Sequence, residues 1–431
     1  MLYYSLNHQS PKVSFAEAAV KGQAPDKGLY FPEEIPVISE DFIKNIKRYT
    51  KEEIGFNVMK PYVGNTIPDE VLQKIVNETI NFDFPLVRIN DNISSLELFH
   101  GPTLAFKDVG ARFMSRCLGY FNRNANQHVT VLVATSGDTG GAVANGFLGV
   151  EGVDVVILYP KGKVSKIQEL QLTTLGKNIT ALEVDGTFDD CQAMVKQAFM
   201  DEELNAKISL TSANSINVAR WLPQQLYYFF AYQQWEEKEP PVICVPSGNF
   251  GNICAGILAY ISGLPVKHFI AACNANDVVP AYLQTGNYQP KTAVATISNA
   301  MDVGNPSNFV RILELFHNQF NNFKDAVSSM SVDDITTAQT IKDVYEQDRY
   351  TLDPHGAVAY YALAQYQQQH PTDKGFILET AHPVKFPDTV EDATGKSLEF
   401  PQQVQYLLHE DKKSILMDAK FDSFKEWLTN R

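Results

Sequence analysis

The sequence has few cysteines, no long apolar run and fewer basic than acidic residues. Its 431 residues include five cysteines, an odd number without a CxxC pair, so neither a disulfide framework nor a zinc cluster is expected. The nine histidines are scattered and HExxH is absent, so we expect no metal site. This cysteine usage is typical of a reducing compartment, and the cytoplasm is the expected location.

Membranes and nucleic acids are not expected as partners. No stretch approaches the roughly 18–20 apolar residues of a membrane helix, and residues 1–10 lack the pattern of a signal peptide. With 36 basic and 50 acidic residues the net charge is −14, and such a surface repels nucleic-acid phosphates. A local pocket for a small anion remains compatible with this charge.

The pattern of apolar residues predicts an α/β fold after a mostly helical beginning. The composition, 44% apolar and 20% charged, is that of an ordinary globular protein, and the length suits two or three domains of about 150 residues. Apolar residues recur at helical spacing in 69–79, whereas beyond Phe84 short β-branched runs alternate with helical stretches. This alternation predicts buried parallel sheets. The predicted strands are 129–134, 153–159, 179–184, 242–246, 266–272 and 376–379, with a helix near 190–203.

Two Gly-rich turns follow predicted strands, at the carboxyl ends where parallel sheets bind ligands. In SGNFGN (247–252), the glycines let consecutive amides face one phosphate in front of a helix. This motif contains neither GxGxxG nor a Lys-Ser/Thr pair, so it is not a nucleotide-binding motif. In TSGDTGG (135–141), hydroxyls and amides suit a carboxylate. An ordinary βα turn and a capped helix start are the alternatives for these two motifs.

Three further motifs carry polar groups that could serve a ligand. In HGPTLAFKD (100–108), the apolar context of Lys107 favours a lowered pKa and Schiff-base chemistry, although a lone lysine is more often a surface residue. In SANSINVAR (212–220), Arg220 can hold a second anion through its planar guanidinium, unless the segment is only a cap and a surface arginine. In ETAHPVKF (379–386), Thr380 offers a hydroxyl to a heteroaromatic nitrogen, or simply ends a strand.

Together and in this order, the five motifs resemble those of the threonine synthase family in its bacterial and fungal form. Its members are pyridoxal-phosphate (PLP) enzymes of fold type II, the tryptophan-synthase-β type. The resemblance begins at VSFAEAAVKG (13–22) and covers nearly the whole chain. It implies an extra, mostly helical N-terminal domain (1–84) and a PLP-binding α/β region (85–390). That region comprises two parallel-sheet domains with the active site between them, followed by a C-terminal helical extension (391–431).

The resemblance also implies a role for each motif. Lys107 matches the catalytic lysine that forms a Schiff base with the cofactor, and Thr380 matches the hydroxyl beside the pyridine nitrogen. It also implies three sets of binding residues. The cofactor phosphate is bound by Gly248, Asn249, Phe250, Gly251 and Asn252. The substrate carboxylate is bound by Ser136, Gly137, Asp138 and Thr139, and the substrate phosphate by Asn214, Ser215 and Arg220. The chain departs from the pattern at Asn252, where many relatives have Asp, and at Glu379, where a small residue is commoner.

The implied reaction converts O-phospho-L-homoserine and water to L-threonine and phosphate, by β,γ-elimination and replacement. It is the last step of threonine biosynthesis. The resemblance also implies a monomer, and without a visible plant-type N-terminal segment we expect no control by S-adenosylmethionine. The alternatives are another fold-type-II lyase such as a serine or threonine dehydratase, a non-catalytic homologue that binds phosphorylated amino acids, and a structural protein without a small ligand. A dehydratase would need no site for a substrate phosphate. A non-catalytic binding protein would need no buried amine, and a structural protein would need no polar turns at strand ends.

Overall fold

Two mainly parallel sheets form the centre of the molecule, which the computed structural model describes over residues 1–123 and 128–431. The six-stranded sheet has the order β12-β11-β10-β13-β5-β4, and only the β4–β5 pair is antiparallel. Its central strands are buried along their whole length, as expected for parallel strands covered on both faces. The bounds are β4 Leu86–Arg88, β5 Ile93–Glu97, β10 Val242–Pro246, β11 His268–Cys273, β12 Val327–Ser331 and β13 Gly375–Glu379.

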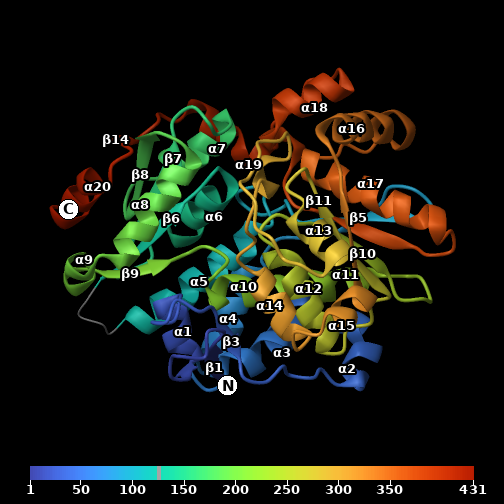
Figure 1. The fold of residues 1–431 in the computed structure, drawn as a ribbon, viewed down its shortest axis with the longest axis horizontal. Coiled ribbons are helices and arrows are strands. Elements are labelled where there is room, and N and C mark those ends of the chain that lie inside the picture. The colour runs from blue at the N-terminus through green and yellow to red at the C-terminus, as the bar shows by residue number, and fades with distance from the viewer. Residues whose placement is uncertain (124–127) are drawn as a thin grey trace.

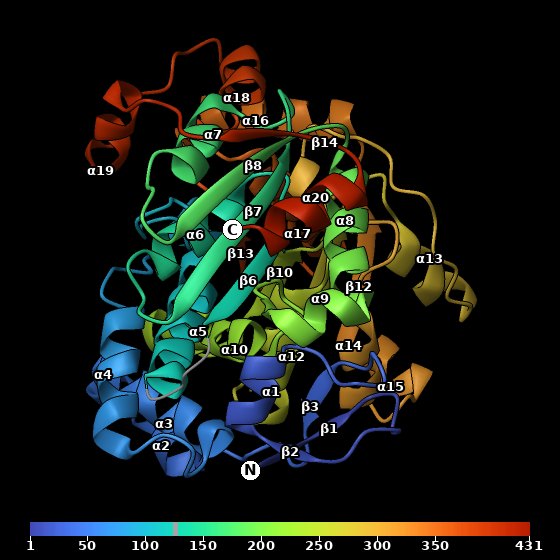
Figure 2. The ribbon, with the colours of Figure 1, turned by 90° about the vertical axis from the view of Figure 1, so that its left-hand side faces the viewer.

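The second sheet has five strands, all parallel, in the order β14-β8-β7-β6-β9. It lies on the left in Figure 1, beside the larger sheet on the right. Figure 2 shows α8 and α20 on its outer side, where their apolar residues pack against β7 and β8. The bounds are β6 Val129–Ala134, β7 Val153–Pro160, β8 Ile179–Asp185, β9 Ser209–Ser212 and β14 Ile415–Asp418.

The strands of both sheets are connected largely through helices, which confirms the predicted α/β fold. The α-helices are α5 Lys107–Asn122, α6 Asp138–Phe147, α7 Lys166–Thr173, α8 Phe188–Met200, α9 Glu202–Lys207, α10 Val218–Trp221, α11 Leu226–Gln234, α12 Gly251–Ile261, α13 Val278–Thr285, α14 Phe309–Leu315, α15 Phe320–Ala326, α16 Asp334–Asp348, α17 Pro354–Gln369, α18 Pro387–Thr394, α19 Gln402–Gln405 and α20 Phe421–Thr429. Short 3₁₀ turns are η2 Leu222–Gln225, η3 Asn299–Met301, η4 Pro383–Lys385 and η5 Tyr406–His409.

The N-terminal part lies at the bottom of Figures 1 and 2, beneath the two sheets. It is mostly helical as predicted, and α4 occupies the predicted range, but it also contains a small antiparallel sheet in the order β2-β1-β3. Capping boxes begin α1 at Ser14 and α3 at Thr50. The bounds are β1 Leu2–Ser5, β2 Val13–Ser14, β3 Tyr30–Pro32, α1 Phe15–Lys21, α2 Glu40–Lys44, η1 Ile46–Arg48, α3 Lys51–Val63 and α4 Asp69–Thr79.

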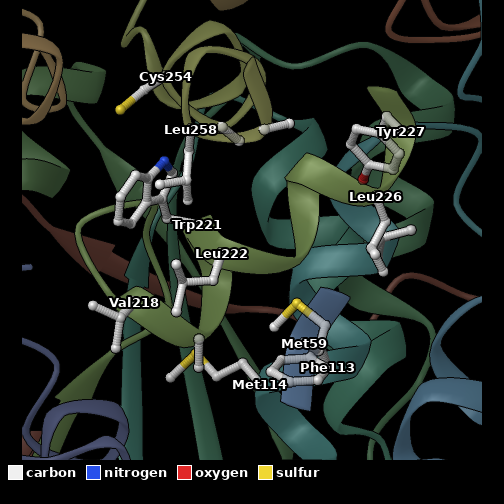
Figure 3. Packing of buried hydrophobic residues seen from close by; sticks show 14 of the residues in the cluster. Met59, Phe113, Met114, Val218, Trp221, Leu222, Leu226, Tyr227, Cys254 and Leu258 are labelled. Atoms are coloured by element: carbon white, nitrogen blue, oxygen red, sulfur yellow. The ribbon is translucent and has the colours of Figure 1, made fainter. Parts of the chain in front are cut away.

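The largest hydrophobic core joins the N-terminal part to both sheets. Figure 3 shows Trp221 of α10 packed near Leu258 of α12, with Met59 of α3 close to Phe113 of α5. All of these side chains are fully or almost fully buried. The core therefore continues across the boundary expected near residue 84, so the N-terminal part and the α/β region pack as one body.

The C-terminal segment 391–431 differs from the purely helical extension that we expected. It contains α19, η5 and α20, but also the strand β14, which pairs in parallel with β8 and becomes an edge of the five-stranded sheet. Ile415 and Leu416 of this strand are exposed, so β14 is an edge strand that is not buried on both faces. No helix in 1–123 or 128–431 combines the length and apolar character needed to cross a bilayer.

Candidate functional site

The segment before Lys107 is held in a tight turn by its own side chains. The buried Asp108 carboxylate accepts hydrogen bonds from the backbone N of Thr103 at 2.9 Å and from its Oγ1 at 2.6 Å. Leu104, inside the turn, adopts φ 60°, which is rare for a branched residue. A Cβ at Gly101 would lie 2.4 Å from the Asp108 carboxylate, so that position requires glycine. The turn places Lys107 at the first position of α5.

This turn lies against the segment that follows the carboxyl end of β13 and begins with Thr380. The Phe106 N donates to the Thr380 O at 2.9 Å, and the His382 N donates to the Leu104 O at 3.0 Å. Ala105 and Ala381 form an antiparallel bridge between these two bonds. The structure therefore brings two predicted site segments, far apart in sequence, side by side at one sheet edge.

Lys107 has a half-buried side chain in a strongly charged neighbourhood. Burial, reinforced by the positive charges of Arg220 and Lys385, lowers the pKa of Lys107 to about 8, although the Asp138 carboxylate opposes the shift. Such an amine has a sizeable neutral fraction near pH 8, as nucleophilic and base chemistry requires. The lowered pKa expected from the apolar context is therefore present, and neighbouring charges contribute to it.

The TSGDTGG motif follows β6 and begins α6, as predicted. The Thr135 Oγ1 accepts from the backbone N of Gly137 at 3.0 Å and from that of Gly140 at 2.9 Å. Gly137 has φ 144°, where a side chain would be strained, and its Cβ would lie 2.5 Å from the Gln168 side chain. Ser136 and Thr139 are half-buried. Their hydroxyls and the first-turn amides of α6 remain suited to a carboxylate.

Asp138 of this motif forms a buried ion pair that links the two sheet regions. Its Oδ1 lies 2.7 Å from the Nζ of Lys385, which also donates to the Thr103 O at 2.7 Å. The Gln168 Nε2 donates to the same Oδ1 at 2.9 Å. Burial raises the pKa of Asp138, but the charges of Lys385 and Lys107 outweigh it and lower the pKa to about 2. Asp138 is thus a fixed anion that holds Lys385 rather than a free donor to a substrate carboxylate.

The SGNFGN motif follows β10 and leads into α12. Phe250 takes the left-handed conformation, φ 59°, and no side chain caps the helix that begins at Gly251. A Cβ at Gly248 would lie 2.5 Å from the Cα of Met301, so the loop packs directly on another backbone. The Asn252 Nδ2 is buried without a hydrogen-bond partner among the described residues. Uncapped amides and an unpaired amide donor at a helix N-terminus suit an anion.

The SANSINVAR motif reaches two different parts of the site. The Ser215 Oγ accepts from the Asn249 Nδ2 at 2.9 Å, which places Ser215 against the Gly248–Asn252 loop. Arg220, on α10, lies instead against α5, where a Cβ at Gly110 would be 3.1 Å from its Nε. Burial lowers the pKa of Arg220 to about 10. The Asn214 Oδ1 and Arg220 Nε are buried polar atoms with no hydrogen-bond partner in the described chain.

The sequence interpretation missed two buried cations near the site, Lys385 and Arg311. Lys385 belongs to the ETAHPVKF motif (379–386). Its neighbours in sequence do not indicate a contact with Asp138, which lies 247 positions away. Arg311 donates to the backbone O of Ser215 at 2.9 Å and to the Asn308 Oδ1 at 2.7 Å, and Asn308 in turn donates to the Ser215 Oγ at 3.0 Å. No local signal marks either residue, because Asp138 and Ser215, the partners that tie them to the site, come from distant segments.

Comparison with known proteins gives consistent matches along the whole chain. Residues 92–378 match the family model "Pyridoxal-phosphate dependent enzyme", residues 2–80 match "Threonine synthase N terminus" and residues 356–427 match "Threonine synthase, C-terminal". The chain is 45% identical over 432 residues to threonine synthase of Escherichia coli, with all of both chains covered.

Two solved structures share the fold over their whole length. The crystal structure of threonine synthase from Escherichia coli matches with a TM-score of 0.92 and 43% identity, covering 100% of both chains. The PLP-bound threonine synthase from Brucella melitensis matches with a TM-score of 0.93 and 33% identity, covering 100% of this chain and 99% of that one.

Proposed function

Because the chain belongs to the threonine synthase family of pyridoxal-phosphate-dependent enzymes, we infer that it converts O-phospho-L-homoserine and water to L-threonine and phosphate. It is a carbon–oxygen lyase acting in threonine biosynthesis. The alternative of a serine or threonine dehydratase loses its support, since the matches at both ends of the chain are to threonine synthase models.

The residues present fit pyridoxal phosphate. The uncapped start of α12 and the unpartnered Nδ2 of Asn252 suit its phosphate, with Gly248, Asn249, Phe250 and Gly251 providing the backbone. Lys107 supplies an amine of lowered pKa for the covalent link, and Thr380 lies on the segment beside it. When bound, the cofactor withdraws electrons from the substrate carbons and makes their protons removable.

Lys107 is the group to which we assign proton transfer. Its amine, with a pKa near 8, can take a proton from the substrate Cα, and we assign the proton transfer at Cβ to the same group. Lys385 supports this role in two ways. Its charge lowers the pKa of Lys107, and its ion pair with Asp138 offsets the attraction of that carboxylate for protonated Lys107.

The two anionic ends of the substrate need separate sites. We assign the carboxylate to Ser136, Gly137 and Thr139, with Asp138 as the structural anion of that loop. Asn214, Ser215 and Arg220 remain the candidates for the phosphate, and the unpartnered Nε of the buried Arg220 supports this assignment. Arg220 and Lys385 are positive charges that act on Lys107, so the site has local partners for an anion although the chain is acidic.

A product assay tests the function directly. Purified protein with added PLP should release phosphate from O-phospho-L-homoserine and form threonine in equal amounts. The observation that carries the proposal is the proximity of Lys107 and Thr380 at one sheet edge in a chain that matches this family end to end. Phosphate release with a keto acid as the product would contradict the addition of water.

The Arg220→Ala variant tests the substrate-phosphate assignment. In this variant the substrate phosphate loses its guanidinium partner. We therefore expect KM for O-phospho-L-homoserine to rise by about tenfold or more while PLP stays bound. The Arg220→Lys variant keeps the charge and should lose less. An unchanged KM in Arg220→Ala would remove Arg220 from this role.

Three further properties stay proposals. We propose a monomer, to be checked by light scattering of the purified protein, where twice the mass of one chain would contradict it. We propose a cytoplasmic location, to be checked by cell fractionation, in line with five cysteines that are all buried and unbridged in the described chain. The division of the chain into domains at residues 84 and 390 also remains a proposal, to be checked by limited proteolysis of the purified protein.

A further inference from the structure

Asp353 and His355, at the start of α17, connect two backbone segments that border the proposed cofactor site. Asp353 is the N-cap of the helix, and its Oδ1 accepts from the His355 backbone N at 2.6 Å and from the ring Nδ1 at 2.5 Å. Its Oδ2 accepts from the Ala381 N at 3.3 Å. Asp353 is fully buried and His355 is 2% exposed, so water does not compete for these bonds.

The hydrogen bonds determine the protonation of His355. Its Nε2 lies 3.2 Å from the backbone N of Ala300, which can only donate. Nε2 therefore accepts and carries no proton, so the proton resides on Nδ1 and is donated to Asp353. His355 therefore bridges the Asp353 side chain and the backbone amide of Ala300.

The two segments held by this bridge lie at different ends of the site. Ala381 follows Thr380 and pairs with Ala105 in the Lys107 turn. Ala300 belongs to η3, whose backbone packs on Gly248, since a Cβ there would come within 3.1 Å of the Ala300 O. A continuous chain of contacts thus runs from the Thr380 end of the site through Asp353 and His355 to the phosphate loop.

Glu379 supports the bridge from the strand side. Its buried carboxyl accepts from the backbone N of Asp353 at 2.5 Å. Gly356 leaves room for it, because a Cβ at that position would lie 1.6 Å from the Glu379 Oε2. The large residue before Thr380, a departure from the family pattern, therefore has a structural partner in the Asp353 backbone.

We propose that Asp353 and His355 are positioning residues that hold the Gly248–Asn252 loop at a set distance from the Thr380 end, and thereby make the site select phosphorylated over unphosphorylated pyridoxal. The inference rests on the proposed function, which requires PLP. Neither residue needs to contact the cofactor: each acts through backbone atoms of Ala381 and Ala300. Loosening the bridge should weaken the binding of the cofactor phosphate more than the binding of the pyridine ring.

The test compares affinities for PLP and for pyridoxal in the full chain stripped of cofactor, by absorbance titration. His355→Phe keeps the ring that packs on Phe386, with centroids 4.8 Å apart, but loses both ring hydrogen bonds. The control is His268→Phe. His268 is a half-buried histidine in β11 of the six-stranded sheet, and its ring hydrogen-bonds Ser328. We expect the ratio of the two affinities to fall at least about tenfold in His355→Phe and to stay unchanged in His268→Phe.

The outcomes separate positioning from general stability. A His355→Phe protein that loses affinity for both ligands equally, or only melts earlier with the ratio intact, overturns the inference. If this variant does not fold, Asp353→Asn provides the same measurement, and an unchanged ratio there also overturns it. Wild-type protein that binds PLP and forms threonine keeps the proposed function even then, whereas wild-type protein that does not bind PLP contradicts both.

Discussion

At the residue scale, the chemistry depends on how a few buried charges are paired. Asp138 is the anion between Lys385 and Lys107, but only Lys385 is in direct contact with it. Lys107 is therefore left close to several charges, and among the described residues it has no close ion pair that would keep it protonated. In a buried site this difference matters, because screening by water is weak.

Replacing Lys107 by alanine should abolish turnover and the covalent attachment of the cofactor. Loss of proton transfer alone accounts for about 10²–10⁴-fold, and loss of the link adds to it. Borohydride reduction followed by peptide mass mapping checks the attachment, and phosphate release checks the turnover. Near-normal turnover in Lys107→Ala would exclude this residue as the base.

Replacing Lys385 by methionine should change the pH dependence of the reaction. Removing this cation raises the pKa of Lys107, both by deleting a repulsion and by freeing Asp138 to attract the ammonium group. The neutral amine then forms only at higher pH, so the acidic limb of kcat moves to higher pH and turnover falls more at pH 7 than at pH 9.

Lys385→Arg is the control, because it keeps a positive charge beside Asp138. Its acidic limb should stay near that of the wild type even if turnover falls. A loss of kcat by the same factor at every pH in Lys385→Met would mean that Lys385 serves only packing.

At the scale of elements, the site forms where strand ends, turns and helix N-termini meet. The apolar runs of β6, β7, β10 and β13 were predictable, since such strands are buried on both faces and need no partner information. β5, β9 and β12 were not predicted, because their Ser and Thr residues break the apolar pattern. These strands gain their stability from neighbouring strands rather than from their own composition.

Replacing Gly248 by alanine should weaken cofactor binding. The added Cβ would lie 2.5 Å from the Met301 Cα, a backbone atom that cannot move without shifting η3. We expect the dissociation constant of PLP, measured by absorbance titration, to rise by about tenfold or more with the protein still folded.

Gly251→Ala is the matched control in the same loop. Its Cβ would lie 3.3 Å from the Asn308 Nδ2 and 3.4 Å from the Ser215 Cβ, side chains that can adjust. Its effect should be the smaller of the two. Equal losses in both variants would mean that close packing on Met301 is not what the loop requires.

At the scale of the whole molecule, the site combines elements of both sheets. Lys107 and Thr380 belong to the region of the six-stranded sheet, whereas Asp138 begins a helix of the five-stranded sheet. The Asp138–Lys385 pair and the Gln171–Thr103 hydrogen bond at 3.1 Å connect the two regions. Because these contacts join the two regions, a ligand held by one region should stabilise both of them as one unit.

PLP should raise the unfolding temperature of the full chain. At a free concentration one hundred times the dissociation constant, binding only the folded state adds about 2.7 kcal/mol to the free energy of unfolding. Differential scanning calorimetry with and without PLP measures the shift. A transition that splits in two, with only one part moving, would contradict cofactor coupling between the two regions.

The sequence by itself determined the fold class and the segments that carry the site. Hydrophobic runs specify buried strands locally, and Gly-rich turns after them specify helix starts with free amides, so both could be read from neighbouring residues. Only the tertiary structure decided which polar groups meet: Asp138 with Lys385, Ser215 with Asn249, and His355 with Ala300. These pairs join residues tens to hundreds of positions apart, and a hydrogen bond or ion pair depends on distances of a few ångströms that only the packed chain defines.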